Sequence, residues 1–316
     1  MKRRRFLKAT LAAGVATQIG SLNAEELAMI SGSAVPTREY RDGIRLSIIG
    51  IGGIVVMGGS QKAADDRVAE AVRAGINYFD VAPSYGDGEA EEKLGPALRP
   101  HRKNAFLACK TMERSAAGAE KELHRSLRRL MTDYFDLYQF HAVTSMNDVE
   151  QIFAPGGAAE TFVRARRDGL VRYVGFSAHS ESAAIAMMDR LPFDSVLFPF
   201  NFVCFSRGDF GPRVLQRAKE KGVARLALKA MAYTPWPKDA QRTYPKCWYR
   251  PVDDEDFAGR ALRFTLSEDV TAALPPGDEK LFTMAIRLAR SFSPLTPDER
   301  KDLLARTTNL EPLFRT

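Results

Sequence analysis

The sequence predicts an α/β fold of the (β/α)8 TIM-barrel type, and three observations support this prediction. After Pro36, short runs of β-branched and aromatic residues alternate with segments of helical periodicity, which is the pattern of parallel βα units. A generous count gives eight such units. The roughly 280 residues that contain them are enough for a closed barrel. An open, doubly wound sheet is the alternative architecture.

The expected strands are short, and the first of them ends in a glycine-rich segment that includes Gly52 and Gly53. The eighth strand has the weakest pattern. In chain order the expected strands cover residues 45–51, 77–81, 105–110, 135–140, 171–176, 195–198, 224–230 and 270–273.

A helix is expected after each strand. Gly75 stops the first helix, Leu123, Leu127 and Leu130 share one face of the third, and Gly169 follows the fourth as a C-terminal cap. In chain order the expected helices cover residues 63–74, 89–98, 116–130, 158–168, 182–190, 212–221, 254–266 and 279–291.

The N-terminus resembles an export signal. Residues 3–8 (RRRFLK) resemble the twin-arginine motif, and a mildly apolar run of small residues follows them. We therefore expect residues 1–36 to be a signal peptide and linker, cleaved after Ala24 or Ala34, and residues 37–316 to form the barrel. The protein is then expected in the periplasm, or otherwise exported by the twin-arginine machinery. An ordinary basic, amphipathic tail is the alternative.

The composition argues against several other classes of protein. The chain is 45% hydrophobic and 27% charged, as in soluble globular proteins, and we expect no stable membrane span. The net charge of +7 includes five positive charges before residue 9, and elsewhere acids alternate with bases, so no nucleic-acid partner is expected. The three cysteines and four histidines lack the spacing of a metal site, so no metal is expected.

Three consecutive expected strands end in polar residues that their apolar runs do not explain. Asp80, Lys110 and His141 end the second, third and fourth strands, and Tyr85 lies in the loop after Asp80. In a barrel of this type the reactive groups lie at the C-terminal ends of the strands, so these four side chains should face one mouth.

The chemistry of such a set is coherent. A tyrosine hydroxyl is a poor acid or base near neutral pH, because its reference pKa is near 10. A nearby ammonium group stabilises the phenolate and lowers that pKa, and a carboxylate keeps the ammonium charged and oriented. A histidine can hold a substrate carbonyl by a hydrogen bond while the tyrosine donates a proton.

These residues carry a resemblance to a known family. Residues 75–86 (GINYFDVAPSYG), followed by 91–95 (EEKLG), resemble the first signature of the aldo-keto reductases. The resemblance implies a catalytic tetrad in which Tyr85 is the general acid, Lys110 depresses its pKa, Asp80 holds Lys110, and His141 orients the carbonyl. It also implies hydride transfer from NADP(H) or NAD(H) to a small aldehyde or ketone. The resemblance runs from about residue 38 to 230 and then fades.

The part expected to hold the cofactor departs from the family pattern. Gly52 and Gly53 are assigned to the cofactor site, as is Ser177, the serine of the family's Ser-Asn pair; the asparagine is missing, because residues 177–179 read Ser-Ala-His. Asn201 is a candidate replacement for the family's glutamine, or alternatively caps a turn. Lys229 falls where the family has the aromatic residue that stacks on the nicotinamide, with Tyr233 nearby as a candidate substitute.

The segment near residue 277 also differs. It keeps the family's Pro-Gly loop but follows it with two acids, so that Lys280 and Arg287 are the candidates for gripping a 2′-phosphate. The choice between NADPH and NADH stays open. The aromatic stretch 233–252 is expected either to line the substrate pocket or to pack on the barrel as a loop.

Three functions remain in competition. The first is a nicotinamide-dependent reductase of carbonyl compounds. The second is a barrel whose cofactor binding is impaired and which acts as a binding or sensor protein. The third is a lyase or aldolase that uses Lys110 as a Schiff-base nucleophile.

Overall fold

The computed structural model describes residues 34–316. Within this range one compact unit extends over Val35–Thr316. Residues 1–33 of the expected signal peptide and linker, with the twin-arginine motif and the Ala24 cleavage site, lie outside the described residues. None of the described helices combines the length and the apolar character that crossing a membrane requires.

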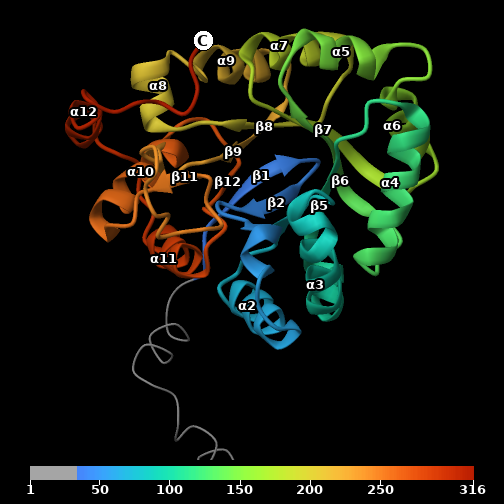
Figure 1. Ribbon diagram of the computed structural model, residues 1–316, viewed down its shortest axis with the longest axis horizontal. Coiled ribbons are helices and arrows are strands. Elements are labelled where there is room, and N and C mark those ends of the chain that lie inside the picture. Colours follow the sequence, from blue (N-terminus) through green and yellow to red (C-terminus); the bar gives the residue numbers. More distant parts are fainter. Residues whose placement is uncertain (1–33) are drawn as a thin grey trace, which may run out of the picture. The chain divides into compact units, whose positions relative to one another are not determined.

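The described chain forms an eight-stranded, parallel sheet surrounded by helices (Figure 1). The sheet closes through a parallel bridge between Ile49 and Ala273, next to which the Gly50 amide donates to the Ala273 carbonyl at 2.9 Å. The predicted (β/α)8 TIM barrel is therefore confirmed, and the open sheet is excluded. Around the barrel the strands are β3 (Ile51–Gly52), β4 (Tyr78–Asp80), β5 (Phe106–Thr111), β6 (Phe135–Val143), β7 (Val171–Ala178), β8 (Ser195–Pro199), β9 (Ala224–Leu228) and β12 (Ala272–Leu274).

Each of the eight expected helices is present near its expected position. They are α2 (Gln61–Arg73), α3 (Glu89–Leu98), α4 (Ala116–Arg129), α6 (Ala158–Arg167), α7 (Glu181–Arg190), α9 (Pro212–Glu220), α10 (Glu255–Ser267) and α11 (Glu279–Arg290). The structure adds helices that were not expected, namely α5 (Met146–Phe153), α8 (Phe202–Gly208), α12 (Pro297–Ala305) and the 3-10 helices η1 (Gly53–Val56), η2 (Tyr85–Gly88) and η3 (Arg99–Asn104). Capping boxes begin α5 and α12, at Ser145 and Thr296, and they are the sequence signal that could have revealed both helices.

The prediction of one strand over residues 45–51 was wrong. The segment divides between β2 (Ile44–Ser47), which pairs with β1 (Thr37–Arg41) in an antiparallel hairpin, and the short barrel strand β3. Asp42 and Gly43, with φ of 52° and 77°, make the tight turn of that hairpin. An apolar run alone does not show which part of it joins the barrel, because both parts are buried.

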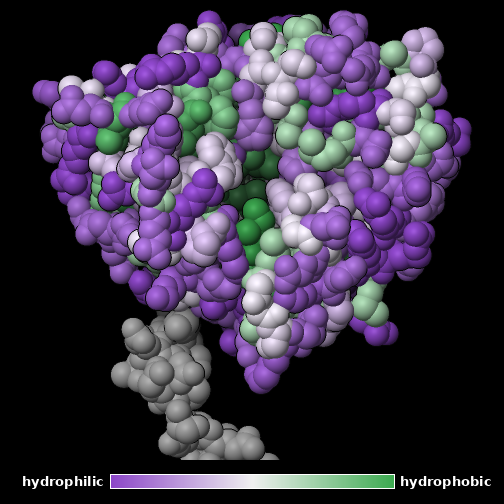
Figure 2. Space-filling view, viewed as in Figure 1, coloured by the Kyte–Doolittle hydropathy of each residue, from purple (hydrophilic) through white to green (hydrophobic). Residues whose placement is uncertain are grey.

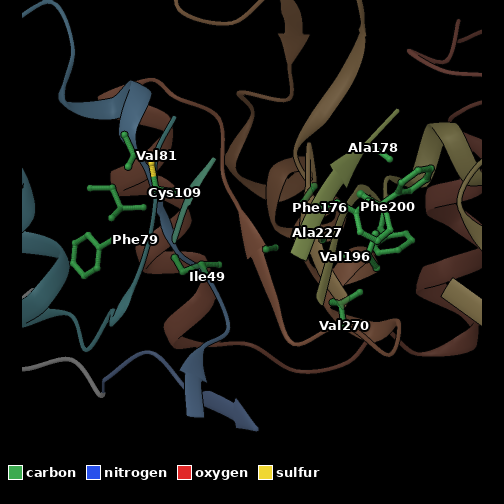
Figure 3. Close-up of a cluster of buried hydrophobic side chains, with 14 of the residues drawn as sticks. Ile49, Phe79, Val81, Cys109, Phe176, Ala178, Val196, Phe200, Ala227 and Val270 are labelled. Carbon is green, nitrogen blue, oxygen red and sulfur yellow. The ribbon is translucent and has the colours of Figure 1, made fainter. Parts of the chain in front are cut away.

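The apolar side chains form two layers. Inside the barrel, inward-facing residues such as Tyr78 and Leu137 pack with Tyr40 and Leu46 of the β1–β2 hairpin. Outside it, the alternate residues of the strands face the helices, as Figure 3 shows for Phe79 and Val81. This alternation, with a period of two, directs Asp80 to the interior between two residues that face outward.

A second hairpin follows the seventh barrel strand. Its strands β10 (Ala232–Pro235) and β11 (Tyr249–Pro251) are antiparallel, and the connection between them carries Trp236 and Trp248. The face of the molecule shown in Figure 2 is largely hydrophilic, and hydrophobic residues are visible in a hollow near its middle.

Candidate active site

A cavity of about 250 Å³ lies where the barrel strands end. Asp80 is the last residue of β4, and Lys110 and His141 lie one and two residues before the ends of β5 and β6. All three line this cavity together with Tyr85. The structure therefore brings together all four residues that the sequence nominated for catalysis. Other lining residues come from the far side of the barrel and from the loop after β9, among them Ser177, His179, Lys229, Lys246, Trp248 and Gly277.

The centre of the site is a buried ion pair. Lys110 Nζ contacts Asp80 Oδ1, and each of the two side chains is only 1% exposed. Burial by itself would lower the pKa of Lys110, but the charge of Asp80 and the proximity of Tyr85 outweigh it, and the pKa lies above its ordinary value. Lys110 is therefore a fixed ammonium group at neutral pH.

Two residues that sequence reasoning missed hold Asp80. Its Oδ2 accepts a hydrogen bond from Gln139 Nε2 at 3.0 Å and from the Tyr78 hydroxyl at 3.3 Å. Tyr78 lies two residues before Asp80 on the same face of β4, and Gln139 lies in β6 two residues before His141. An amide in the middle of an expected strand was the available signal, because a buried amide needs a polar partner.

Tyr85 is carried to the cavity by a turn that needs glycine. Gly86 and Gly88 have φ of 62° and 98°, and a Cβ on Gly88 would lie 2.3 Å from Arg129 Nη1. The Tyr85 hydroxyl then lies 3.4 Å from Lys110 Nζ. Its ring meets the His141 ring edge-on, with 5.7 Å between the ring centres.

The net effect on Tyr85 differs from the sequence-based expectation. Burial raises the pKa of the Tyr85 hydroxyl, and Lys110, which acts to lower it, does not fully compensate. Lys110 thus acts to lower the pKa of Tyr85, as predicted, but the net pKa lies above its ordinary value because the effect of burial is larger. Tyr85 is consequently a neutral phenol at neutral pH, which is the protonation state that a proton donor requires.

His141 is held as a neutral ring. Burial, together with the positive charges of Lys110, Arg114 and Lys229, keeps the pKa of His141 well below its ordinary value. Its Nδ1 lies 3.4 Å from Ser84 Oγ. In the tautomer in which Ser84 donates to Nδ1, the ring proton is on Nε2, where it can donate to a carbonyl oxygen.

The residues nominated for cofactor binding fall into two groups. Gly52, Ser177 and Lys229 line the cavity. Ser177 Oγ accepts from the Ala142 amide at 2.8 Å, which leaves the hydroxyl proton available to donate to an amide group. Gly52 faces open space, because a Cβ there would meet nothing within 4 Å.

Gly53, Asn201, Lys280 and Arg287 are not among the residues that line the cavity. Gly53 packs against Val81, and Arg287 pairs with Glu255 at 3.0 Å. Lys280 is exposed at the start of α11.

Asn201 has a different role from the one proposed for cofactor binding. Its amide oxygen accepts from the Val203 and Cys204 amides and caps α8, while its nitrogen donates to the carbonyls of Lys229 and Ala232. Because its oxygen and its nitrogen are both engaged by the protein, the turn-capping alternative describes it.

The stretch 233–252 serves as a wall of the cavity, which was one of its two expected roles. Lys246, Cys247, Trp248 and Tyr249 line the cavity. The wall is tied down by Lys246 Nζ, which donates to the Met57 carbonyl at 2.7 Å and pairs with Glu279 at 2.5 Å. Trp236 Nε1 donates to the Cys247 carbonyl at 2.9 Å, and this hydrogen bond holds the two ends of the β10–β11 connection together.

Comparison with known proteins agrees with this arrangement. The sequence model of the aldo/keto reductase family matches residues 49–270, and the chain belongs to this family. The oxidoreductase YqkF of Bacillus subtilis, itself uncharacterized, is 25% identical over 292 residues, which are 83% of this chain and 93% of that protein. The aldo-keto reductase YhdN of the same organism is 30% identical over 201 residues, 58% of each protein.

Solved structures show the same fold. The holo form of the aldo-keto reductase AKR11C1 from Bacillus halodurans superposes with a TM-score of 0.68 at 23% identity, over 89% of this chain and 100% of that one. With the family established, the protein is an NAD(P)H-dependent oxidoreductase, and reduction of carbonyl compounds is its general activity.

Proposed function

We propose that the protein reduces a small aldehyde or ketone and that Tyr85 is the general acid. The observation that carries this proposal is the position of the Tyr85 hydroxyl, in the cavity and 3.4 Å from the buried ammonium group of Lys110. The nicotinamide cofactor, when bound, supplies the hydride.

The chain's own residues then manage the proton. As negative charge develops on the carbonyl oxygen, neutral His141 donates a hydrogen bond to it and the Tyr85 phenol gives up its proton to it. The phenolate that remains is stabilised by Lys110, whose charge is already in place because Asp80 holds it. The group that stabilises the product state thus needs no reorganisation during the reaction.

The cavity fits a nicotinamide group. The Ser177 hydroxyl proton is available to a carboxamide, and the open space beside Gly52 leaves room for a ring close to the backbone. Pro275 and Gly277 also line the cavity, and Lys280, exposed at the start of α11, would be the candidate to hold the 2′-phosphate of NADPH.

The structure argues against Lys110 as a Schiff-base nucleophile. An amine attacks a carbonyl only in its neutral form, and Lys110 is a buried ammonium group with a raised pKa. The hypothesis of a lyase or aldolase based on this residue therefore loses its chemical basis.

The test combines binding and turnover. Purified protein is titrated with NADPH and NADH by intrinsic fluorescence, and turnover of a panel of aldehydes is then measured for the wild type and Tyr85→Phe. We expect nucleotide binding in both proteins and a kcat that is lower in Tyr85→Phe by about 10²–10⁴-fold. Tyr244→Phe is the matched control, because Tyr244 bonds to Asp253 outside the cavity lining.

If neither NADPH nor NADH binds, a binding or sensor protein is favoured over a reductase. Binding without a loss of rate in Tyr85→Phe would remove Tyr85 from the role of general acid.

We also propose that the protein is exported by the twin-arginine route. Support comes from residues 3–8 and the apolar run that follows them. The test is the distribution of the full chain between cell fractions, compared with an Arg3→Lys, Arg4→Lys variant. Retention of both proteins in the cytoplasm would contradict the proposal.

A further inference from the structure

Three lysines line the cavity, and two of them are neutralised by acids. Lys110 pairs with Asp80, and Lys246 pairs with Glu279. Lys229 has no carboxylate partner among residues 34–316. The cavity therefore carries one lysine whose charge is not balanced within the described part of the protein.

The groups around Lys229 can stabilise an ammonium ion but do not neutralise its charge. Its Nζ lies 3.2 Å from His179 Nε2, and 5.4 and 5.6 Å from the ring centres of Trp248 and Phe314. The aromatic rings attract a cation but cannot neutralise it. Their apolar surface also reduces the access of water, which strengthens any ion pair formed there.

The backbone is arranged to present this side chain. Lys229 follows β9 directly and has a φ of 64°, a left-handed conformation that lysine seldom adopts. Its carbonyl is held by Asn201 Nδ2 at 3.0 Å and by the Ala232 amide at 2.9 Å. A buried asparagine thus fixes the conformation from which Lys229 reaches the cavity.

The protonation of Lys229 depends on several neighbours. Burial lowers its pKa to about 7, and the positive charge of Lys110 acts in the same direction, while the Cys204 thiol acts in the opposite one. His179, whose own pKa is lowered to about 3 by burial and by Lys229, is neutral and adds no charge at neutral pH. An anion beside Lys229 would raise the pKa of Lys229 and bind it as the full cation.

We infer that Lys229, assisted by His179, binds a carboxylate group on the substrate. The preferred substrates are then small carbonyl compounds that also carry a carboxylate, such as semialdehydes and keto acids. This inference rests on the proposed function, because it names the substrate class of the same site. The carbonyl faces Tyr85 and His141, and the carboxylate lies against the β7–β9 side of the cavity.

The experiment compares two aldehydes that differ in charge. Succinic semialdehyde and butanal have chains of four carbons, and the ratio of their kcat/KM values measures the preference for the anion. We expect Lys229→Gln to lower this ratio by more than about tenfold and Lys229→Arg to keep most of it. Lys219→Gln is the matched control, and its ratio should change by less than about threefold, because Lys219 is exposed on α9 and does not line the cavity.

A binding measurement without nucleotide provides a second readout. Succinate added to the apoprotein should quench the fluorescence of Trp248, and Lys229→Gln should bind succinate at least about tenfold more weakly. The affinity of the wild-type apoprotein for succinate should fall as the pH rises above about 7, because the pKa of Lys229 is about 7 and its ammonium group loses its proton there.

The outcomes are distinct. An unchanged ratio in Lys229→Gln would overturn the inference. Weaker NADPH or NADH binding, with both aldehydes affected equally, would also overturn it by assigning Lys229 to the cofactor. If no aldehyde is reduced and no nucleotide binds, the proposed function fails, while succinate binding still decides whether Lys229 holds a carboxylate.

Discussion

The two sides of the cavity differ in whether the charge of their lysine is balanced by a carboxylate. On the side of β4–β6, Lys110 is paired with Asp80, and Asp80 is in turn held by Gln139 and Tyr78. On the side of β7–β9, Lys229 faces a neutral histidine and two aromatic rings. The difference agrees with the two proposals: the balanced pair would serve proton transfer to any carbonyl, and the unbalanced charge of Lys229 would select the substrate.

The same comparison separates what is kept of the family pattern from what is changed. The four residues that match the family's catalytic tetrad lie together in the cavity at the C-terminal ends of the barrel strands. On the other side Ser177 lines the cavity, whereas Asn201, the candidate for a cofactor-binding glutamine, instead donates to the Lys229 carbonyl. The predictions that follow test this contrast, from the largest expected effect to the smallest.

Removal of the balancing cation should be the most damaging change. Lys110→Met leaves the Asp80 carboxylate buried without its partner, and we expect the free energy of unfolding to fall by about 3–5 kcal/mol. Denaturant unfolding provides the measurement. The double variant Asp80→Asn, Lys110→Met should recover much of this loss, because no buried charge remains; equal stability of the two variants would contradict the idea that the charge is responsible.

The support of Lys229 should contribute less. Asn201→Ala removes the cap of α8 and the two hydrogen bonds to the carbonyls of Lys229 and Ala232. We expect a loss of about 1–3 kcal/mol in unfolding free energy, together with a reduced preference for succinic semialdehyde over butanal. A loss of stability with the preference intact would show that Asn201 does not position Lys229.

Lys229 should also leave a signature in the pH dependence of stability. Its pKa is about 7 in the folded protein and near 10.5 in an unfolded chain, so the unfolded state binds more protons between these values. Lys229 therefore makes the free energy of unfolding rise with pH from about 7 to 10.5. Lys229→Met should flatten this rise in urea unfolding series; identical pH profiles for both proteins would refute the shift.

The smallest effect is expected for Lys280, the candidate contact of the 2′-phosphate of NADPH. Lys280 is exposed at the start of α11, and exposed ion pairs contribute little. Lys280→Ala should weaken NADPH binding by about two- to fivefold and leave NADH binding unchanged. Equal effects on both nucleotides, in fluorescence titrations, would show that Lys280 does not contact the 2′-phosphate.

The sequence by itself determined the barrel and the catalytic mouth. Parallel strands must end on one face, so polar residues at the ends of three consecutive strands predict a shared site whatever the details of packing. Asp80, Lys110 and His141 could be placed in this way, and Tyr85 could be added because its loop follows directly. The tight glycine turn after Tyr85 is likewise a local feature.

Only the tertiary structure decided the charge balance of the site. Whether Lys229 finds an acid, whether burial outweighs Lys110 at Tyr85, and whether Asn201 is free for a cofactor all depend on residues distant in the chain. The division of residues 45–51 between hairpin and barrel is of the same kind. Local patterns report periodicity and turns, but burial and electrostatic partners are set by which segments meet in space.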